Sequence, residues 1–207
     1  MAVMEESIDA MPDFRSLTLQ VIRHGQCEHN VEAWYAGQED SPLTPVGREQ
    51  ARENGRLLQG LIAGLGTPDF VASPLHRTCA TMELVREAAG LPARGYRTDR
   101  RLMELDVGRH SGRPIAEVRQ TAEHAAYRSD PWNYVRPGGE SNAQLHQRVG
   151  EFLQALARDT VIVCHHGSAR MIRAHYLGLS PAETVGYAPP HVGILTLAHG
   201  GERTVSG

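Results

Sequence analysis

Cysteine is scarce in this sequence, with only three among 207 residues. Cys27, Cys79 and Cys164 are an odd number without a CxxC spacing, which indicates neither a disulfide framework nor a zinc site. We therefore expect a reduced, cytoplasmic protein. Residues 1–16 contain acids and no apolar segment after a basic start, so they do not resemble a secretory signal and are predicted to be a flexible leader.

Long apolar runs and a strong charge of one sign are also missing. No stretch reaches the roughly 20 apolar residues that cross a bilayer, so no membrane contact is expected. The formal net charge of −3 argues against a nucleic-acid-binding surface, because such domains carry a clear basic excess. The sequence also lacks a Walker glycine loop and a carboxylate cluster for two metal ions, so we expect neither a metal nor a cofactor.

Strand and helix patterns alternate along the chain as in an α/β protein. Its length fits one domain with a sizeable core, predicted here to span residues 17–207. The alternation predicts a three-layer α/β/α sandwich with a mostly parallel central sheet. Strands are expected at 17–22, 69–72, 160–164 and 192–198, and helices after Thr44, after Ser73-Pro74, after Ser141 and from Ser168.

Residues 93–140 are less regular and contain one predicted helix, from about Ile115 to Arg128. Long irregular connections in compact domains are commonly lids or binding loops, so we predict a small cap over the carboxyl ends of the strands. Basic and aromatic side chains in the cap could receive an anionic or ring-bearing leaving group, although such a charge mixture is usually a solvated face. They are Arg109, His110, Arg113, Arg119, His124, Tyr127, Arg128, Trp132, Tyr134 and Arg136.

Two predicted strands end on histidines. The apolar run from Leu17 stops on Arg23-His24-Gly25, and the run 160–164 stops on His165-His166-Gly167. Open α/β sheets bind their ligands at the carboxyl ends of the strands, so two strand-end histidines can face each other across one crevice.

Together these residues resemble the histidine phosphatase superfamily, the phosphoglycerate mutase-like proteins, whose hallmark is Arg-His-Gly after the first strand. Further motifs follow in family order, and the likeness spans roughly residues 17 to 198. These motifs are Leu43-Thr44-Pro45-Val46-Gly47-Arg48, Ser73-Pro74-Leu75-His76-Arg77-Thr78, Leu102-Met103-Glu104 with Gly108 and Gly112, Pro137-Gly138-Gly139-Glu140-Ser141, and His166-Gly167.

The resemblance implies phosphoryl transfer through a covalent phosphohistidine at His24. Arg23 and Arg77 are the expected phosphate ligands, because a guanidinium offers forked N–H donors that match phosphate oxygens. His166 is expected to be the second histidine of the site, chosen over His165 because the family pattern is His followed by Gly. Gly167 is included among the phosphate-binding residues.

Asn30 lies where the first motif of the family ends in a phosphate-contacting asparagine. A structural role in a turn is the competing interpretation. Cys27 replaces the usual Ser or Thr of that loop and is expected to pack without reacting.

Glu104 matches the family residue that exchanges a proton with the leaving group and then with water. Asp106 is the alternative. His110-Ser111 departs from the Trp-Glu that often precedes the last glycine of this motif, and Glu140 is expected to orient basic groups of the site.

The resemblance thus predicts a histidine acid phosphatase-like phosphomonoesterase acting on a small phosphorylated metabolite. A cofactor-dependent phosphoglycerate mutase is the alternative, and a non-catalytic phospho-ligand-binding member is a third. Family mutases resembling this chain tend to carry longer segments before the Gly-Gly-Glu-Ser motif, and the short cap here favours hydrolysis. The sequence leaves a homodimer open.

Overall fold

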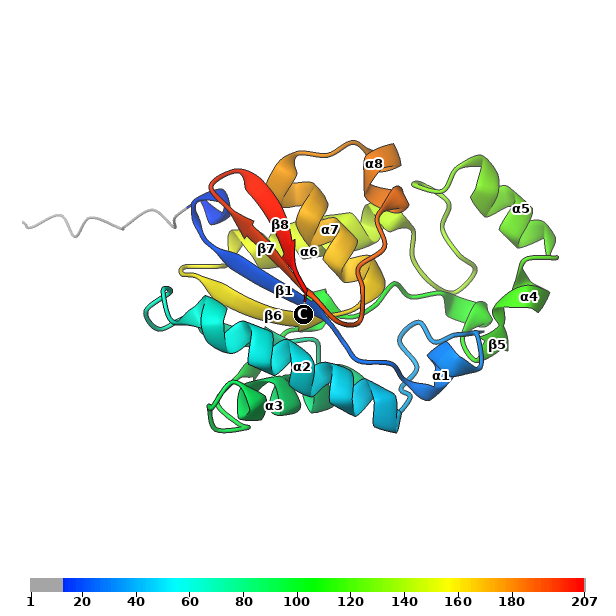
Figure 1. Ribbon diagram of the computed structural model, residues 1–207. Coiled ribbons are helices and arrows are strands. Elements are labelled where there is room, and N and C mark those ends of the chain that lie inside the picture. Colours follow the sequence, from blue (N-terminus) through cyan, green and yellow to red (C-terminus); the bar gives the residue numbers. More distant parts are fainter. Residues whose placement is uncertain (1–12, 207) are drawn as a thin grey trace, which may run out of the picture.

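The structure is a computed structural model that describes residues 13–206. Its centre is a six-stranded sheet with the order β4-β3-β6-β1-β7-β8 (Figure 1). β4, β3, β6 and β1 run parallel, and β7 and β8 continue the sheet as antiparallel strands. The strands are β1 (Leu19–Arg23), β3 (Asp69–Ala72), β4 (Arg97–Thr98), β6 (Thr160–Cys164), β7 (Ile194–Ala198) and β8 (Gly201–Val205).

Helices cover both faces of this sheet. α2 (Pro45–Ile62) and α3 (His76–Ala88) pack together on one face, and α6 (Asn142–Gln154) and α7 (His166–Leu177) pack on the other (Figure 1). All five residues of β6 are buried, as expected for a central parallel strand covered on both sides. The predicted three-layer fold with a mostly parallel sheet is confirmed.

Local sequence signals set the starts of two of these helices. Thr44 caps α2 by accepting a hydrogen bond from the Gly47 N–H, with Pro45 at the first helical position. Ser141 and Gln144 form the predicted capping box of α6.

The end of the predicted leader is folded, which corrects the boundary at residue 16. Residues Phe14–Ser16 form a short 3₁₀ helix, and the Phe14 side chain is buried beside Tyr176. The Tyr176 hydroxyl donates to the carbonyls of Arg15 and Leu17. Burial of an aromatic side chain therefore anchors this segment to α7. Residues 1–12 lie outside the described residues.

The cap differs from its prediction at two points. Residues 97–98 form β4 at the edge of the central sheet, so the predicted insertion at 93–140 includes part of the main domain. The expected helix from Ile115 to Arg128 is two helices, α4 (Ile115–Val118) and α5 (Ala122–Ser129), because Thr121 caps the second.

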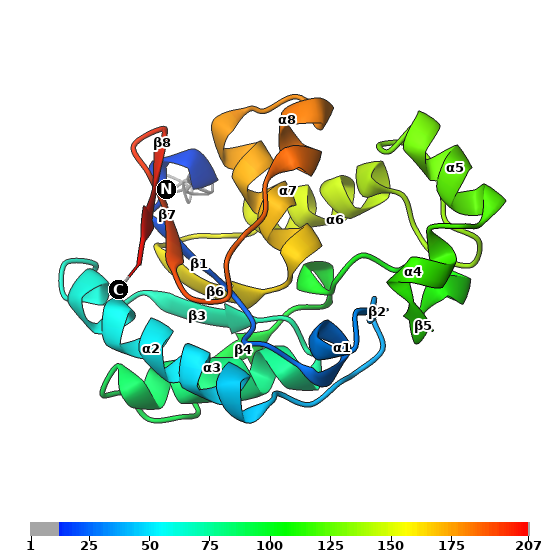
Figure 2. The same cartoon turned by 45° about the vertical axis from the view of Figure 1, so that its right-hand side comes forward.

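The rest of the cap is a two-stranded ribbon of β2 (Trp34–Tyr35) and β5 (Arg113–Pro114). Figure 2 shows α4, α5 and this ribbon on the side of the sheet where β1 ends, near α1 (Glu28–Val31). The cap thus faces the carboxyl ends of the strands.

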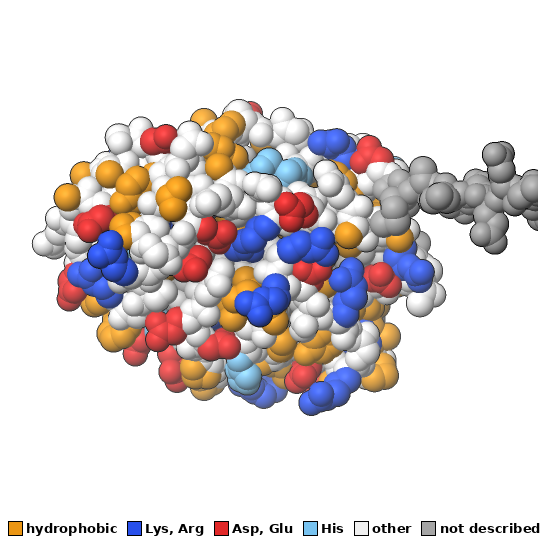
Figure 3. All heavy atoms as spheres, turned by 180° about the vertical axis from the view of Figure 1, so that it is seen from behind, with side chains coloured by type: hydrophobic (Ala, Val, Ile, Leu, Met, Phe, Trp, Pro, Cys, Tyr) orange, Lys and Arg blue, Asp and Glu red, His pale blue; other side chains and the backbone are white. Residues whose placement is uncertain are grey.

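Three short elements complete the description. They are α8 (Pro181–Gly186) and the 3₁₀ turns η2 (Arg100–Leu102) and η3 (Gly108–His110). The opposite face of the molecule carries arginines and carboxylates side by side, with no large field of one charge (Figure 3). Within residues 13–206, no helix has both the length and the apolar character needed to cross a membrane.

Candidate active site

A cavity of about 440 Å³ lies between the carboxyl ends of the strands and the cap. Arg23, His24, Arg77, Glu104 and His166 all line it, and they come from four separate segments of the chain. The structure therefore brings together the predicted nucleophile, both predicted phosphate-binding arginines, the predicted acid and one of the two adjacent histidines.

The strand register decides which histidine meets His24. In the parallel pair of β1 and β6, Arg23 lies opposite Cys164, and the His24 N–H donates to the Cys164 carbonyl at 3.0 Å. The next residues, His24 and His165, therefore stand side by side, with their ring centroids 5.2 Å apart. His166 begins α7 and lines the cavity one residue further on.

His24 is held in one tautomer. Its Nδ1 lies 2.7 Å from the Gly25 carbonyl oxygen, so Nδ1 carries the proton and Nε2 keeps its lone pair. Burial, followed by the charges of Arg77 and Arg23, places the pKa of His24 well below its usual range. The imidazole is therefore neutral at physiological pH, the form that a nucleophile requires.

Two motif glycines allow the backbone to pass close to His24. A β-carbon on Gly25 would overlap the Gly47 carbonyl oxygen, and a β-carbon on Gly47 would overlap the Gln26 carbonyl oxygen. Only residues without a side chain let the loop after β1 touch the start of α2 this closely.

Arg23 and Arg77 each keep one buried N–H without a partner. The Arg77 Nη1 and Nη2 atoms donate to the Glu39 and Gly37 carbonyls, each at 2.7 Å, and Arg23 Nη1 donates to Pro189 at 3.0 Å. Among the described residues, neither Nε has a hydrogen-bond partner. Buried donors are normally paired, so an anion that accepts from both arginines fits this site.

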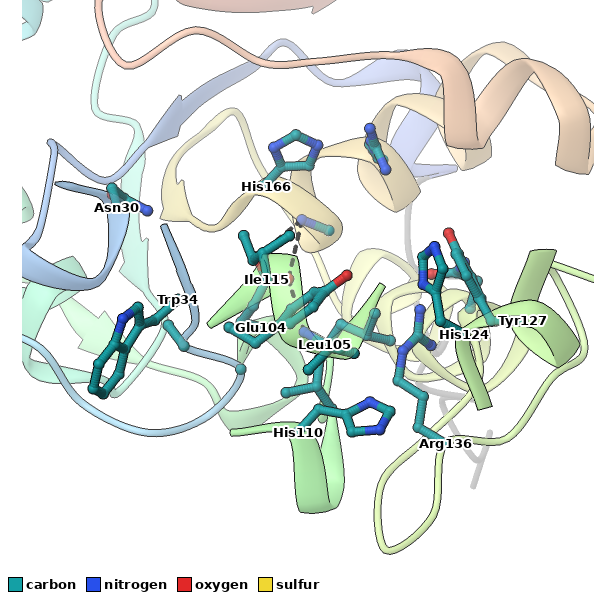
Figure 4. Close-up of a pocket in the computed structure, with 18 of the residues that line it drawn as sticks. Asn30, Trp34, Glu104, Leu105, His110, Ile115, His124, Tyr127, Arg136 and His166 are labelled. Atoms are coloured by element: carbon teal, nitrogen blue, oxygen red, sulfur yellow. Dashed lines mark hydrogen bonds between the residues drawn. The ribbon is translucent and has the colours of Figure 1, made fainter. Parts of the chain in front are cut away.

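Glu104 lies in the loop after η2, and its carboxylate contacts the first turn of α7. Its Oε1 accepts from the Gly167 N–H at 3.0 Å and from the Leu105 N–H at 2.7 Å, and Oε2 accepts only a longer bond from Gly167 at 3.2 Å (Figure 4). A β-carbon on Gly167 would collide with this carboxylate, so a larger residue there would displace the Glu104 side chain. The Gly167 N–H is taken by Glu104, and a phosphate could reach it only in competition.

The loop that carries Glu104 is fixed by Arg148, which the sequence analysis did not identify. Arg148 pairs with the Glu140 carboxylate at 2.6 Å and donates to the carbonyls of Arg101, Met103 and Glu104. The other contact of Glu140 is the Asp106 N–H, which donates to it at 2.9 Å. Glu140 therefore orients an arginine of the supporting structure, and this arginine holds the acid in place.

Asn30 lines the cavity and also fulfils the competing turn role. Its Oδ1 accepts from the backbone N–H and the thiol of Cys27, which closes the first turn of α1. Cys27 is fully buried, as expected for a packed thiol.

His165 and His191 pack against the His24 ring, and His166 lines the cavity. His165 is fully buried; its Nε2 lies 2.8 Å from the Ser73 hydroxyl, and its Nδ1 has no partner among the described residues. His191, which the sequence analysis missed, places Nδ1 2.8 Å from the His24 carbonyl. Burial and Arg170 lower the pKa of His166 to about 3. Burial also lowers the pKa of His165 and of His191, which favours the neutral form of all three rings at pH 7.

Arg170 also lines the cavity and was not identified from the sequence. It lies four residues after His166 on α7, so both side chains project from the same face of the helix. No group of three His, Cys, Asp or Glu residues suited to a metal ion is found between residues 13 and 206.

Comparison with known proteins identifies relatives of this chain. The family model of the Histidine phosphatase superfamily (branch 1) matches residues 19–206. Among curated proteins, the "Probable phosphoglycerate mutase GpmB" of Salmonella paratyphi C is 35% identical over 137 residues, which are 64% of this chain and 60% of that protein. The match therefore spans less than two thirds of that relative's length.

Two solved structures cover nearly the whole chain. The mycobacterial glucosyl-3-phosphoglycerate phosphatase in complex with VO3 has a TM-score of 0.74 at 27% identity, over 92% of this chain and 98% of its own. The alpha-ribazole phosphatase of Shigella flexneri has a TM-score of 0.76 at 23% identity, over 92% and 95%, which is evidence for a shared fold.

Proposed function

Because this chain belongs to the histidine phosphatase superfamily, we propose that it is a phosphomonoesterase acting on a small phosphorylated metabolite through a phosphohistidine at His24. One observation carries the proposal. A neutral His24, with its proton held on Nδ1, lies between two arginines that each have an unpartnered, buried N–H. The similarity to a glucosyl-3-phosphoglycerate phosphatase supports the hydrolase branch.

Two displacements complete the reaction. In the first, His24 Nε2 attacks phosphorus, the bond to the ester oxygen breaks, and Glu104 donates a proton to that oxygen. In the second, water attacks the phosphohistidine, Glu104 takes the proton back, and the P–N bond breaks to release inorganic phosphate. Arg23 and Arg77 stabilise the charge on the phosphoryl oxygens in both steps.

We propose that His166, as expected, donates a hydrogen bond to the phosphoryl group on His24. His166 lines the cavity, whereas His165 is fully buried, is not among the lining residues and places its Nε2 2.8 Å from the Ser73 hydroxyl. His165 then packs against the His24 ring, with their ring centroids 5.2 Å apart.

The pair His165→Asn and His166→Asn tests this assignment. We expect His166→Asn to lower kcat by about 10²-fold, the usual cost of one donor to the transition state, and His165→Asn to have a smaller effect on kcat. Steady-state kinetics with one aryl phosphate measure both. The reverse order of kcat losses would assign the role to His165.

A phosphoglycerate mutase is the second candidate, favoured by the similarity to the probable phosphoglycerate mutase GpmB. A mutase must keep its phosphoenzyme away from water while the intermediate turns over. The short cap, which consists of α4, α5 and the β2–β5 ribbon, supports hydrolysis instead.

A panel of small phosphate esters distinguishes the two activities. Phosphate release is measured beside 3-phosphoglycerate interconversion, with and without 2,3-bisphosphoglycerate. We expect release from at least one ester to be faster than interconversion. Primed interconversion faster than release from every ester would favour the mutase, and no turnover at all would favour a phospho-ligand-binding protein.

Activity should not depend on a metal ion. Two arginines and two histidines supply the positive charge and hydrogen bonds that a bound metal would otherwise provide. We expect full phosphatase activity after dialysis against a chelator. Loss of activity that Mg²⁺ or Zn²⁺ restores would contradict this prediction.

We also propose a cytoplasmic location. Cys27, Cys79 and Cys164 are all free thiols, and Cys27 and Cys164 are buried. Unpaired thiols are typical of reducing compartments. The expected partner is the small phosphorylated substrate, with no nucleic acid or membrane involved, and association into a homodimer stays an open expectation.

A further inference from the structure

The cavity holds more positive charge than one phosphate group needs. Besides Arg23 and Arg77, it is lined by Arg119, Arg136 and Arg170, whereas Glu104 and Glu123 are its only carboxylates in the described part of the chain. Two forked guanidinium groups already match the charge of a phosphate dianion. The remaining arginines could therefore bind a second anionic group. Hydrogen bonds fix the side chains of two of them.

Arg136 is the most buried of these three arginines. Only 8% of its surface is exposed, its Nη1 donates to the Glu140 carbonyl at 3.1 Å, and its guanidinium carbon lies 4.8 Å from the centre of the Tyr127 ring. No carboxylate of residues 13–206 forms an ion pair with it within 4.0 Å. A buried cation without an anion is costly, which favours an anion brought by the ligand.

Arg170 lines the same cavity from α7. Its Nε donates to the Tyr187 carbonyl, which fixes the side chain and leaves both Nη groups for other partners. Burial lowers the pKa of Arg136 and of Arg170, and the nearby Tyr127 hydroxyl opposes this shift for both guanidinium groups. Figure 4 shows Arg136, Tyr127 and His124 grouped at the cap side of the cavity, apart from His166 and Glu104.

The exposed cap arginines differ from this pair. Arg128 on α5 and Arg109 are exposed and do not line the cavity, and Arg113 lies 3.9 Å from Glu117. Arg119 lines the cavity but is also exposed. Burial thus separates Arg136 and Arg170 from the solvated charges of the cap.

We propose that Arg136 and Arg170 form a second anion-binding subsite, so that the substrate is a phosphate ester whose leaving group carries its own carboxylate or phosphate. This rests on the proposed function for the placement of the first phosphate at His24. The second anion binds at the cap end of the cavity, against the Tyr127 ring, while the ester oxygen lies near Glu104.

Binding of non-hydrolysable phosphonates tests the subsite without any turnover. Calorimetry would compare propylphosphonate with 3-phosphonopropionate and 1,3-propanebisphosphonate, and hexylphosphonate with the corresponding six-carbon acids. We expect the second anion to tighten binding at least about tenfold at one of the two lengths, as for a charge-assisted hydrogen bond in a closed site. The better of carboxylate and phosphonate identifies the class of the second anion.

Variants connect the gain to the named residues. In Arg136→Met the affinity ratio of the doubly charged to the singly charged ligand should fall to about 1, and in Arg170→Met it should fall in the same direction. Arg136→Lys should keep part of the ratio. Arg128→Met, an exposed arginine on α5, is the matched control and should keep all of it.

Either of two results overturns the subsite. One is an affinity ratio of the doubly to the singly charged ligand near 1 in the unmodified protein at both lengths, or no binding of any phosphonate. The other is a ratio that survives in both Arg136→Met and Arg170→Met. A preserved ratio in a protein that hydrolyses no ester would instead reject the phosphatase and keep the subsite.

Discussion

His24→Asn is expected to lower the hydrolysis of every phosphate ester by at least about 10⁴-fold, since removing a covalent nucleophile from an enzyme costs on the order of 10⁶ in kcat. Asparagine retains a polar group of similar reach but has no nucleophilic nitrogen. The loss should be the same for esters with good and poor leaving groups, because both require the attack by Nε2. Single-turnover kinetics with an aryl and an alkyl phosphate measure it.

His199→Asn is the matched control for this substitution. His199 lies exposed in the β7–β8 turn with a φ of 51°, a conformation that asparagine tolerates well. We expect its activity to be unchanged. Activity above about one hundredth of the original in His24→Asn would place the nucleophile elsewhere, with His165 the first residue to examine.

Glu104→Gln should slow phosphorylation of the enzyme by about 10² to 10⁴-fold with an alkyl phosphate and much less with a nitrophenyl phosphate. A poor leaving group needs a proton as the ester bond breaks, and a good one leaves without it. Glutamine keeps an oxygen for the Gly167 and Leu105 N–H groups, so the loop geometry is preserved. Rapid-quench measurements of the first turnover give both rates.

Asp106→Asn separates the two carboxylates considered for this role. Its Oδ1 accepts from the Gly108 N–H at 2.8 Å, a local contact that asparagine can reproduce. We expect only a small change with either ester. A leaving-group-dependent loss in Asp106→Asn, together with a normal Glu104→Gln, would exchange their roles.

Local signals allowed much of the fold to be predicted. Thr44 with Pro45 and Ser141 with Gln144 specify helix starts through hydrogen bonds within four residues, so a short window of sequence contains the whole cause. The same kind of signal was overlooked at Thr121, whose hydroxyl accepts from the His124 N–H and starts α5. Because helix-forming residues continue from Ile115 to Arg128, the sequence pattern did not indicate the break between α4 and α5.

Pairing between distant strands could not be predicted in the same way. β4 has two residues and β8 is almost entirely exposed, so neither carries an apolar pattern that identifies a strand. The choice between His165 and His166 depends on the register of β1 against β6, a contact across about 140 residues of sequence. The register places His165 beside His24 as a fully buried ring, and it leaves His166, which the motif comparison favoured, in the lining of the cavity.

Several individual residues of the site could not be predicted from the sequence for the same reason. Arg148, Arg170 and His191 belong to none of the sequence motifs, and contacts with residues distant in the sequence hold each of them in place. Arg136 was one of many cap residues in the sequence, and only its burial against Tyr127 sets it apart. The fold brings the motif residues together, and the residues that hold them in position can be identified only from the three-dimensional structure.

The most direct test of the phosphohistidine is to trap it. Enzyme mixed with ³²P-labelled ester is quenched in alkali within milliseconds, digested, and the labelled peptide is mapped by mass spectrometry. We predict one label that is stable in base and lost in acid, on His24, and absent from His24→Asn. A label that is stable in acid, or one that maps to another residue and persists in His24→Asn, would contradict the mechanism.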